Sequence, residues 1–412
     1  TSPLKYYTSE WWTKQIQLGL NQRKKLGSED RWQDITRYYE NRWEDPRQPN
    51  FNLVYMLSSS LVPTMVFQSP GIMNTARRQE FNKWAQFFDG IDNYLVDVME
   101  IKKIMSDAVL QAFLYNTVGL QVGYDYPDMT NEIEEQDLQF LPVPNCLDRS
   151  RKINQPWVDM IPSDRLVLAP GTSSMKNCAW FAKLVVMPTR VLKSMKYFKN
   201  VESNKVPEEI TKSESVKWIT DASSDEEYTS FYEIHDAEKQ QWFCLDAVNS
   251  KFITDIEHDP LQVQGLPLEV LVFNPGTKSI WGTPDSLYIE SQMLEGNECR
   301  RDGRLQRKSA LVKAFYDNDI LDQEKVEALL SGKAMTMIGV SLPPDKTIDQ
   351  VLSLVQTHVQ IEYFEYQKQL LNDAQLLTGN GPNQLGTFAP GRRTAKETAV
   401  VEQNNLLRVG KR

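Results

Sequence analysis

The last third of the sequence, Pro284 to Arg412, most constrains what this chain can fold into. A polar helix is predicted over Pro284–Lys308, followed by a small insert over Ser309–Pro344 and a second long helix over Asp345–Leu376. Next comes a loop at residues 377–393 that is rich in Gly, Asn, Pro and Gln. Two long helices that frame a small insert do not enclose a closed catalytic core. They suit one subunit of a ring with a channel.

The first of these helices, Pro284–Lys308, carries its acidic residues before its basic residues. That order favours side-chain pairs along a helix and suits the helix dipole. At 1.5 Å per residue the helix would extend roughly 37 Å. It can be a solvated helix with internal salt bridges, a helix that packs on symmetry copies, or one whose arginines face phosphates. The residues expected to pair between subunits are Glu295, Glu298, Arg300, Arg301, Arg304, Arg307 and Lys308.

The insert is too small to bury an apolar face alone. Its sequence predicts a strand at Ser309–Tyr316, a short helix at Asp322–Leu330 and a second strand at Ala334–Val340. We therefore expect it to pair with neighbouring copies or with another protein. The residues predicted to bind that partner are Lys313, Phe315, Tyr316 and Lys325.

The segment after the insert combines an apolar helix with a polar loop. The helix Asp345–Leu376 is predicted from apolar residues at helical spacing, beginning with Ile348, Val351 and Val355. The long loop that follows is either functional or a mobile surface segment. Its polar side chains that suit a polyanion are Asn380, Asn383, Gln384, Arg392 and Arg393. A third helix is predicted from Thr394. Since the chain starts at Thr1 and reaches Arg412 inside this helix, we expect both natural ends to lie outside the sequence.

The first 283 residues are predicted to be helical at first and mixed β afterwards. Helices are expected over Tyr6–Arg42, over Phe51–Val66 with Pro63 as its end, and over Ala76–Tyr115. A strand at Thr117–Tyr124 opens the mixed β part. The helical region before it has an apolar stripe made of Phe81, Trp84, Phe88, Ile91, Leu95, Val98 and Ile101.

Composition argues against several classes of function. The net charge of −9 is unsuited to tight binding of nucleic acid by the chain as a whole. The four cysteines form no CxxC pair, and the three histidines lie far apart in sequence, so no metal or cofactor is expected. No phosphate-binding loop or nucleophile motif occurs, which argues against an enzyme. No apolar run approaches the ~20 residues needed to span a bilayer.

Several short motifs in a fixed order carry a resemblance to a known family. They lie at Pro49–Leu57, Phe67–Pro70, Asp92–Leu95, Gly119–Asp125, Trp157–Pro162, Gly282–Ser286, and Gln292–Asn297 with Arg300. In this order they resemble the portal proteins of tailed double-stranded-DNA bacteriophages over nearly the whole chain. Met293 and Leu294 stand where the family often has a second polar residue, which weakens one motif position.

The resemblance implies an α+β portal architecture assembled as a dodecameric ring. Residues 1–283 would form an α/β wing, 284–308 and 345–376 the stem helices, and 309–344 the clip. Residues 377–393 would be a tunnel loop beside DNA, and the helix from Thr394 would return to the wing. The C-terminal part of the wing and a crown would follow after Arg412.

The resemblance also implies partners and a location. The ring would bind the large terminase subunit, a head–tail adaptor, and the major capsid and scaffolding proteins. It would contact double-stranded DNA without sequence specificity and would not meet a membrane. The protein would be assembled in the host cytoplasm and located at the capsid vertex of the virion. Two alternatives stay open: another virion structural protein, such as an adaptor or minor head protein, and a carboxylate-dependent hydrolase.

Overall fold

The structure describes most of the predicted helical region and much of the mixed β region, but only part of the predicted insert. The computed structural model describes residues 6–43, 50–66, 70–124, 156–195, 198–202, 227–259, 265–309, 313–316, 322–324, 327, 341, 343–345, 347, 352–355 and 362–378. Three predicted features therefore lie outside the described residues: the strand at Ala334–Val340, the loop from Gly379 to Arg393 and the helix from Thr394. The strand predicted at Phe67–Gly71 lies mostly outside them as well.

The protein is an α+β chain whose sheets are antiparallel. It divides into two compact units. Unit 1 comprises residues 1–42, 52–290 and 375–412, and unit 2 comprises residues 43–51 and 291–374. None of the helices in the described ranges is both long enough and apolar enough to cross a membrane.

Unit 1 begins with helices α1 (Ser9–Leu26) and α2 (Trp32–Tyr39), joined by the short 3-10 helix η1 (Glu29–Arg31). The helical region predicted over Tyr6–Arg42 is confirmed, but it is interrupted in its middle. Gly27 ends α1, and Ser28 adopts a left-handed backbone conformation with φ of 56°, which a continuous right-handed helix does not allow. Apolar periodicity continues across this break, so the sequence pattern did not reveal it.

Arg23 connects helix α1 to the backbone at residues 163–166 by hydrogen bonds. Its guanidinium is buried and donates to the backbone carbonyls of Ser163, Asp164 and Leu166 at 3.2, 2.9 and 2.8 Å. The remaining donors meet both carboxylate oxygens of Glu29 at 2.7 and 3.1 Å. The planar fork of arginine suits this two-pronged pairing, and the buried charge is fully compensated.

Helix α3 (Leu53–Met65) is capped by Asn52, whose side chain accepts from the backbone N–H of Tyr55 at 3.0 Å. The prediction that Pro63 ends this helix is wrong. Pro63 lies inside α3, and the hydrogen bond from Val66 to the carbonyl of Val62 closes one more turn behind it. Pro63 lacks only the hydrogen bond that its own N–H would donate to the carbonyl of Ser59, and the backbone of the following residues continues the helix.

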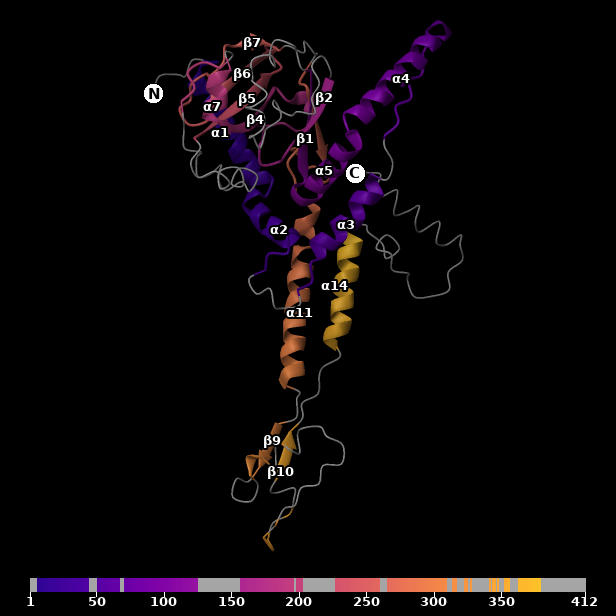
Figure 1. The fold of residues 1–412 in the computed structure, drawn as a ribbon, viewed down its shortest axis with the longest axis vertical. Helices are drawn as coiled ribbons and strands as arrows, with labels where there is room; N and C mark the ends of the chain where they lie inside the picture. Colours follow the sequence, from indigo (N-terminus) through magenta and orange to yellow (C-terminus); the bar gives the residue numbers. More distant parts are fainter. Residues whose placement is uncertain are drawn as a thin grey trace. The chain divides into compact units, whose positions relative to one another are not determined.

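The helical region before the first sheet is divided into η2 (Gln79–Phe81), α4 (Asn82–Val98) and α5 (Ile101–Tyr115). Glu100, with φ of 50°, separates the two long helices. Helix α5 buries Ala108, Val109, Ala112, Phe113 and Leu114, whereas α4 buries only Val96. In Figure 1, α4 projects from α5 away from the sheets of unit 1.

Two sheets form the mixed β part of unit 1. The smaller sheet has the order β2-β1-β8, made of β1 (Thr117–Tyr124), β2 (Pro156–Ile161) and β8 (Leu268–Val272). The larger sheet has the order β3-β4-β5-β6-β7. Its strands are β3 (Leu166–Leu168), β4 (Trp180–Pro188), β5 (Tyr228–Asp236), β6 (Gln241–Asp246) and β7 (Glu257–His258).

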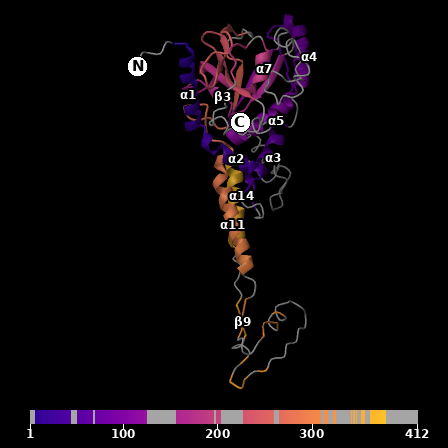
Figure 2. The same cartoon turned by 60° about the vertical axis from the view of Figure 1, so that its left-hand side comes forward.

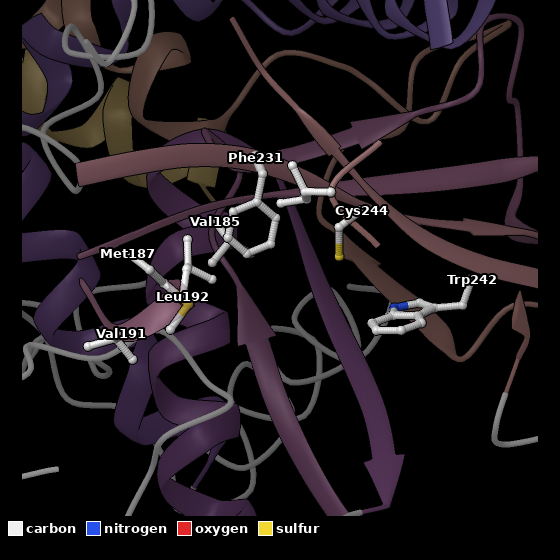
Figure 3. Close-up of a cluster of buried hydrophobic side chains, with 8 residues drawn as sticks. Val185, Met187, Val191, Leu192, Phe231, Trp242 and Cys244 are labelled. Atoms are coloured by element: carbon white, nitrogen blue, oxygen red, sulfur yellow. The ribbon is translucent and has the colours of Figure 1, made fainter. Parts of the chain in front are cut away.

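The larger sheet holds the main hydrophobic core. All nine residues of β4 are buried and all except Lys183 are apolar, so the strand does not alternate between apolar and polar residues. Helix α7 (Thr189–Ser194) follows β4 directly and packs on the same sheet. Figure 3 shows the cluster on one side of this sheet, with Met187 of β4, Phe231 of β5 and Leu192 of α7 among its members.

Helix α10 (Asp285–Tyr288) closes the central part of unit 1, and α11 (Glu290–Ser309) begins directly after it. Unit 2 contains most of α11, the strands β9 (Lys313–Tyr316) and β10 (Leu352–Val355), and most of α14 (Glu362–Thr378). Helices α11 and α14 run side by side in opposite chain directions in both views (Figures 1 and 2).

The second long helix predicted over Asp345–Leu376 is wrong in its first half. Residues Leu352–Val355 form β10, which pairs antiparallel with β9, and the helix begins only at Glu362. The spacing of Val351, Leu352 and Val355 fits a helix, but the alternation around Ser353 also fits a short strand. Pairing with β9 decides between them, because it satisfies backbone groups that a lone segment leaves open.

Candidate functional site

Helix α11 carries most of the functional residues that the sequence predicted. It is mostly polar, with a narrow buried stripe formed by Met293, Gly296, Cys299 and Gly303 and two exposed leucines, Leu294 and Leu305. These residues recur at the three- and four-residue spacing of one helix face. Small side chains dominate the stripe, so a neighbouring backbone can approach this face closely. The other faces are free to carry charge.

Most of the predicted subunit-pairing residues do lie on exposed faces of α11. Glu295, Glu298, Arg301, Arg307 and Lys308 are exposed. Within the helix, Arg301 pairs with Glu298 at 3.4 Å and with Asp302 at 3.9 Å. Exposed pairs of this kind stabilise a helix by only about 0.3–0.5 kcal/mol. The charges therefore contribute little to the folding of one chain.

Arg300 has a different environment from the other arginines of α11. Its guanidinium lies 4.7 Å from the ring centroid of Phe51, and partial burial lowers the pKa of Arg300. The backbone N–H of Phe51 donates to Asn297 on the same helix at 2.5 Å. Arg300 and Asn297 thus hold the segment around Phe51 against α11, an intrachain contact that the sequence did not suggest. Arg304 is half-buried as well.

The predicted partner-binding residues of the insert are only partly described. Lys313, Phe315 and Tyr316 lie on β9, opposite Val355, Ser353 and Leu352 of β10. Lys325 lies outside the described residues, and so do all five predicted loop residues: Asn380, Asn383, Gln384, Arg392 and Arg393. Their role as a contact with DNA stays a prediction.

A buried charge cluster between the two sheets of unit 1 was not expected from the sequence. His235 of β5 lies 2.9 Å from Asp259 through Nδ1 and 3.4 Å from Glu233 through Nε2. Lys183 of β4 donates to Gln121 of β1 at 3.2 Å, and this amide lies 3.5 Å from His235 Nε2. The cluster thus joins the smaller sheet to the larger one.

The two carboxylates hold a proton on His235. Burial alone favours the neutral imidazole, but the hydrogen bonds and charges of Asp259 and Glu233 outweigh it and raise the pKa of His235. The same ion pair, with Lys183 and a hydrogen bond from Trp242, lowers the pKa of Glu233 to about 2. The ring of Phe181 stacks on His235 with centroids 4.8 Å apart.

This cluster bears directly on the hydrolase alternative. A hydrolase needs a nucleophile or an activated water within hydrogen-bond reach of its acid or base. Among the described residues, the side chains that meet His235 are two carboxylates and an amide, and the ring is covered by Phe181. No group of three or more potential metal ligands occurs in the described ranges. The arrangement therefore suits a structural ion cluster between sheets.

Nothing local in the sequence signals this cluster, because His235 of β5 and Gln121 of β1 belong to different sheets and meet only where the two sheets pack together. The aromatic stripe of α4 is the opposite case. Its spacing was visible in the sequence, but the structure leaves Phe81, Trp84 and Phe88 of the predicted stripe 50–59% exposed, together with the neighbouring Phe87 and Tyr94. Periodicity locates such a face and does not say what covers it.

The class defined by these features is an α+β protein in which a two-sheet unit continues into a unit with two long helices and a strand pair. No protein-family model and no curated protein matches the chain. One similar solved chain comes from the "Virion of native gene transfer agent (GTA) particle". It is 10% identical, with a TM-score of 0.43, over 93% of this chain and 79% of that chain.

Two further solved chains show a comparable likeness. One, from the "Neck of native GTA particle computed with C12 symmetry", is 11% identical with a TM-score of 0.42. It covers 92% of this chain and 76% of that chain. The other, from the "Neck of empty GTA particle computed with C6 symmetry", is 11% identical with a TM-score of 0.43 over 91% and 75%. Likeness at this level is too low to infer a shared function.

Proposed function

We propose that this chain is the portal protein of a tailed double-stranded-DNA bacteriophage. Twelve copies form a ring at one vertex of the capsid. The ring is the channel through which DNA is packaged and later ejected, and the docking site for the terminase and then for the head–tail adaptor. The protein has no catalytic activity of its own, and its location is the virion.

The observation that carries this proposal is the pair of long helices with a strand pair between them in the sequence. Helix α11 ends at Ser309, β9 and β10 pair in antiparallel register, and α14 follows from Glu362. A helix that is polar on most faces needs either solvent or neighbouring copies to satisfy its charges. In a ring, we expect exposed charges of α11, among them Glu298 and Arg301, to pair with charges on neighbouring copies.

The strand pair is proposed as the docking unit for the motor and the adaptor. A two-stranded antiparallel pair is marginally stable by itself in water. Contact with neighbouring copies, and with a partner protein, supplies the missing packing. Lys313, Phe315 and Tyr316 on β9, together with Lys325, are the proposed contact residues.

The proposed contact with DNA is the loop that contains Arg392 and Arg393. Duplex DNA carries about one charge per 1.7 Å, so a few arginines per subunit, repeated around a ring, interact strongly with it. The chain's net charge of −9 keeps the rest of the channel from adhering to DNA. Asn380, Asn383 and Gln384 add uncharged hydrogen-bonding groups in the same loop.

Replacement of both loop arginines by alanine tests the DNA contact. We expect rings to form normally and the amount of DNA retained per capsid to fall severalfold. The matched control replaces the exposed Lys24 and Lys25 of α1, which removes the same charge elsewhere. Heads with the loop variant that package and retain DNA like the wild type would contradict this part of the proposal.

The runner-up is another virion structural protein, such as an adaptor or a minor head protein. The paired long helices and the predicted terminase-binding strand favour the portal. The two functions differ in one direct binding measurement. A portal ring binds the large terminase subunit before the tail is attached, whereas an adaptor binds the assembled portal and not the terminase.

A further inference from the structure

An aromatic face on α4 lies uncovered on the surface of unit 1. The ring of Phe87 contacts those of Trp84 and Phe88 edge-on, with centroids 6.2 and 6.0 Å apart. The seven members of this aromatic face recur at helical spacing along one side of η2 and α4. They are Phe81, Trp84, Phe87, Phe88, Ile91, Tyr94 and Val98, each between 37% and 59% exposed.

The other side of α4 is already occupied by the chain. The backbone at Ile72 exchanges two hydrogen bonds with Asn93, each 2.9 Å long. Asn74 donates through its side chain to Asp92 at 2.8 Å and through its backbone to Asp89. Residues 72–74, called the strap from here on, thus fix the rotation of α4 about its axis. The aromatic face is therefore held outward by specific contacts.

The aromatic face exposes a large apolar area. Aromatic side chains carry about 150–250 Å² each, so five that are 50–59% exposed leave about 500 Å² in water. The largest apolar patch on a typical monomer is about 300–600 Å² and is often functional, so this face has the size of a binding patch. Ile91 and Val98, each 37% exposed, extend it, and a standard interface that buries about 800 Å² on each partner can include all of it.

The face is also hollowed where a side chain from a partner can enter. A depression of about 440 Å³ lies between the aromatic side chains and the strap. It is lined by Trp84, Phe88 and Phe81, with Asn74, Thr75, Ala76 and Ala85 completing its wall. Apolar walls with one polar edge suit a bulky apolar side chain of a protein. The acidic residues Asp89 and Asp92 beside the strap disfavour a nucleic acid.

We infer that the aromatic face of α4 is a contact surface between adjacent copies of this chain, an inference that rests on the proposed ring. A ring closes by head-to-tail contacts, so each copy buries two different surfaces against its two neighbours. The size of the aromatic face matches one side of such a contact. Arg77, Arg78 and Lys83 beside it are exposed and form no ion pair among the described residues, which suits a neighbour of net charge −9.

The test compares two variants. One places a negative charge within the aromatic face, and the control places the same charge outside it. Phe87→Glu places a carboxylate in the middle of the aromatic face. Gln86→Glu adds the same charge one residue earlier, at an exposed position outside the aromatic face. Both positions are exposed, so circular dichroism and the melting temperature of the monomer are expected to match those of the wild type.

We expect rings from the wild type and from Gln86→Glu, and at least a tenfold loss of rings from Phe87→Glu, counted by mass photometry and electron microscopy. Rings from Phe87→Glu at the wild-type level would overturn the inference, even if such rings failed to enter capsids. Failure of the proposed function looks different. In that case the wild type itself gives only monomers or closed dimers.

Discussion

Strand β4 and helix α4 are opposite cases within unit 1. All nine residues of β4 are buried, whereas α4 buries one residue, Val96, out of seventeen. Both segments are rich in large apolar side chains. The strand finds its partners within the same chain, and the helix does not. Apolar sequence therefore indicates burial, but only the structure tells whether one chain or an assembly provides it.

The largest expected effect contrasts two phenylalanines from these regions. Phe181 in β4 is fully buried, and Phe87 on α4 is 58% exposed. Phe181→Ala is expected to lower the free energy of unfolding by about 3–5 kcal/mol, because it leaves a cavity in a packed core. Phe87→Ala is expected to change it by less than about 0.5 kcal/mol. Urea denaturation of both monomeric variants measures the difference. Equal losses would show that α4 is packed within the chain.

The next effect concerns the buried charge cluster. Asp259→Ala leaves His235 with one carboxylate partner, and removal of one partner from a buried ion pair costs about 3–5 kcal/mol. We expect a value near the lower limit, since Glu233 stays in place. Asp255→Ala, which removes an exposed carboxylate paired with Lys199, is the control and should cost much less. A loss below 1 kcal/mol for Asp259→Ala would show that the cluster is not a joint between the sheets.

A smaller effect is the pH dependence that the same cluster imposes. The pKa of His235 is raised in the folded state, so its contribution is complete below the unfolded pKa of about 6.5 and is lost as pH rises through the folded pKa. The pKa of Glu233 is lowered to about 2, so its contribution is present above its unfolded value of 4.5 and is lost toward pH 2. The cluster therefore stabilises most between about pH 4.5 and 6.5.

Denaturation at several pH values tests this sign. The stability of the wild type should fall between pH 6 and pH 9 by more than that of a His235→Gln variant. His258→Gln is the matched control, because it replaces an exposed histidine of the same sheet. A wild-type slope that His235→Gln does not alter would mean that His235 is neutral in the folded protein.

The smallest effect concerns the exposed charges of α11. Glu298→Gln removes an exposed pair with Arg301 and should change the stability of the monomer by less than about 0.5 kcal/mol. If Glu298 pairs across a subunit boundary, the same change should weaken rings, most clearly at low salt. Sedimentation at low and high salt separates the two effects. Stability and assembly that are both unchanged would remove Glu298 from the proposed contact.

Local patterns in the sequence predicted α3, α5, α11 and several strands, because their periodicity reflects one buried face. They did not show the helix break at Ser28, which a single residue in a left-handed conformation causes. They also failed at Leu352–Val355, where a short apolar run fits both a helix and a strand. The charge cluster around His235 was not predictable. It depends on the packing of two sheets whose residues are far apart in sequence, and no spacing encodes that. The exposure of the aromatic side chains of α4 was not predictable either, because periodicity locates an apolar face and does not say what covers it.

The central claim is that the chain assembles into a ring, and electron microscopy of the purified protein at several concentrations tests it most directly. The account predicts closed rings with a central channel and a mass about twelve times the 47.6 kDa of one chain. Images that contain only monomers or closed dimers under every condition would contradict the portal function, and with it the proposed role of the aromatic face of α4.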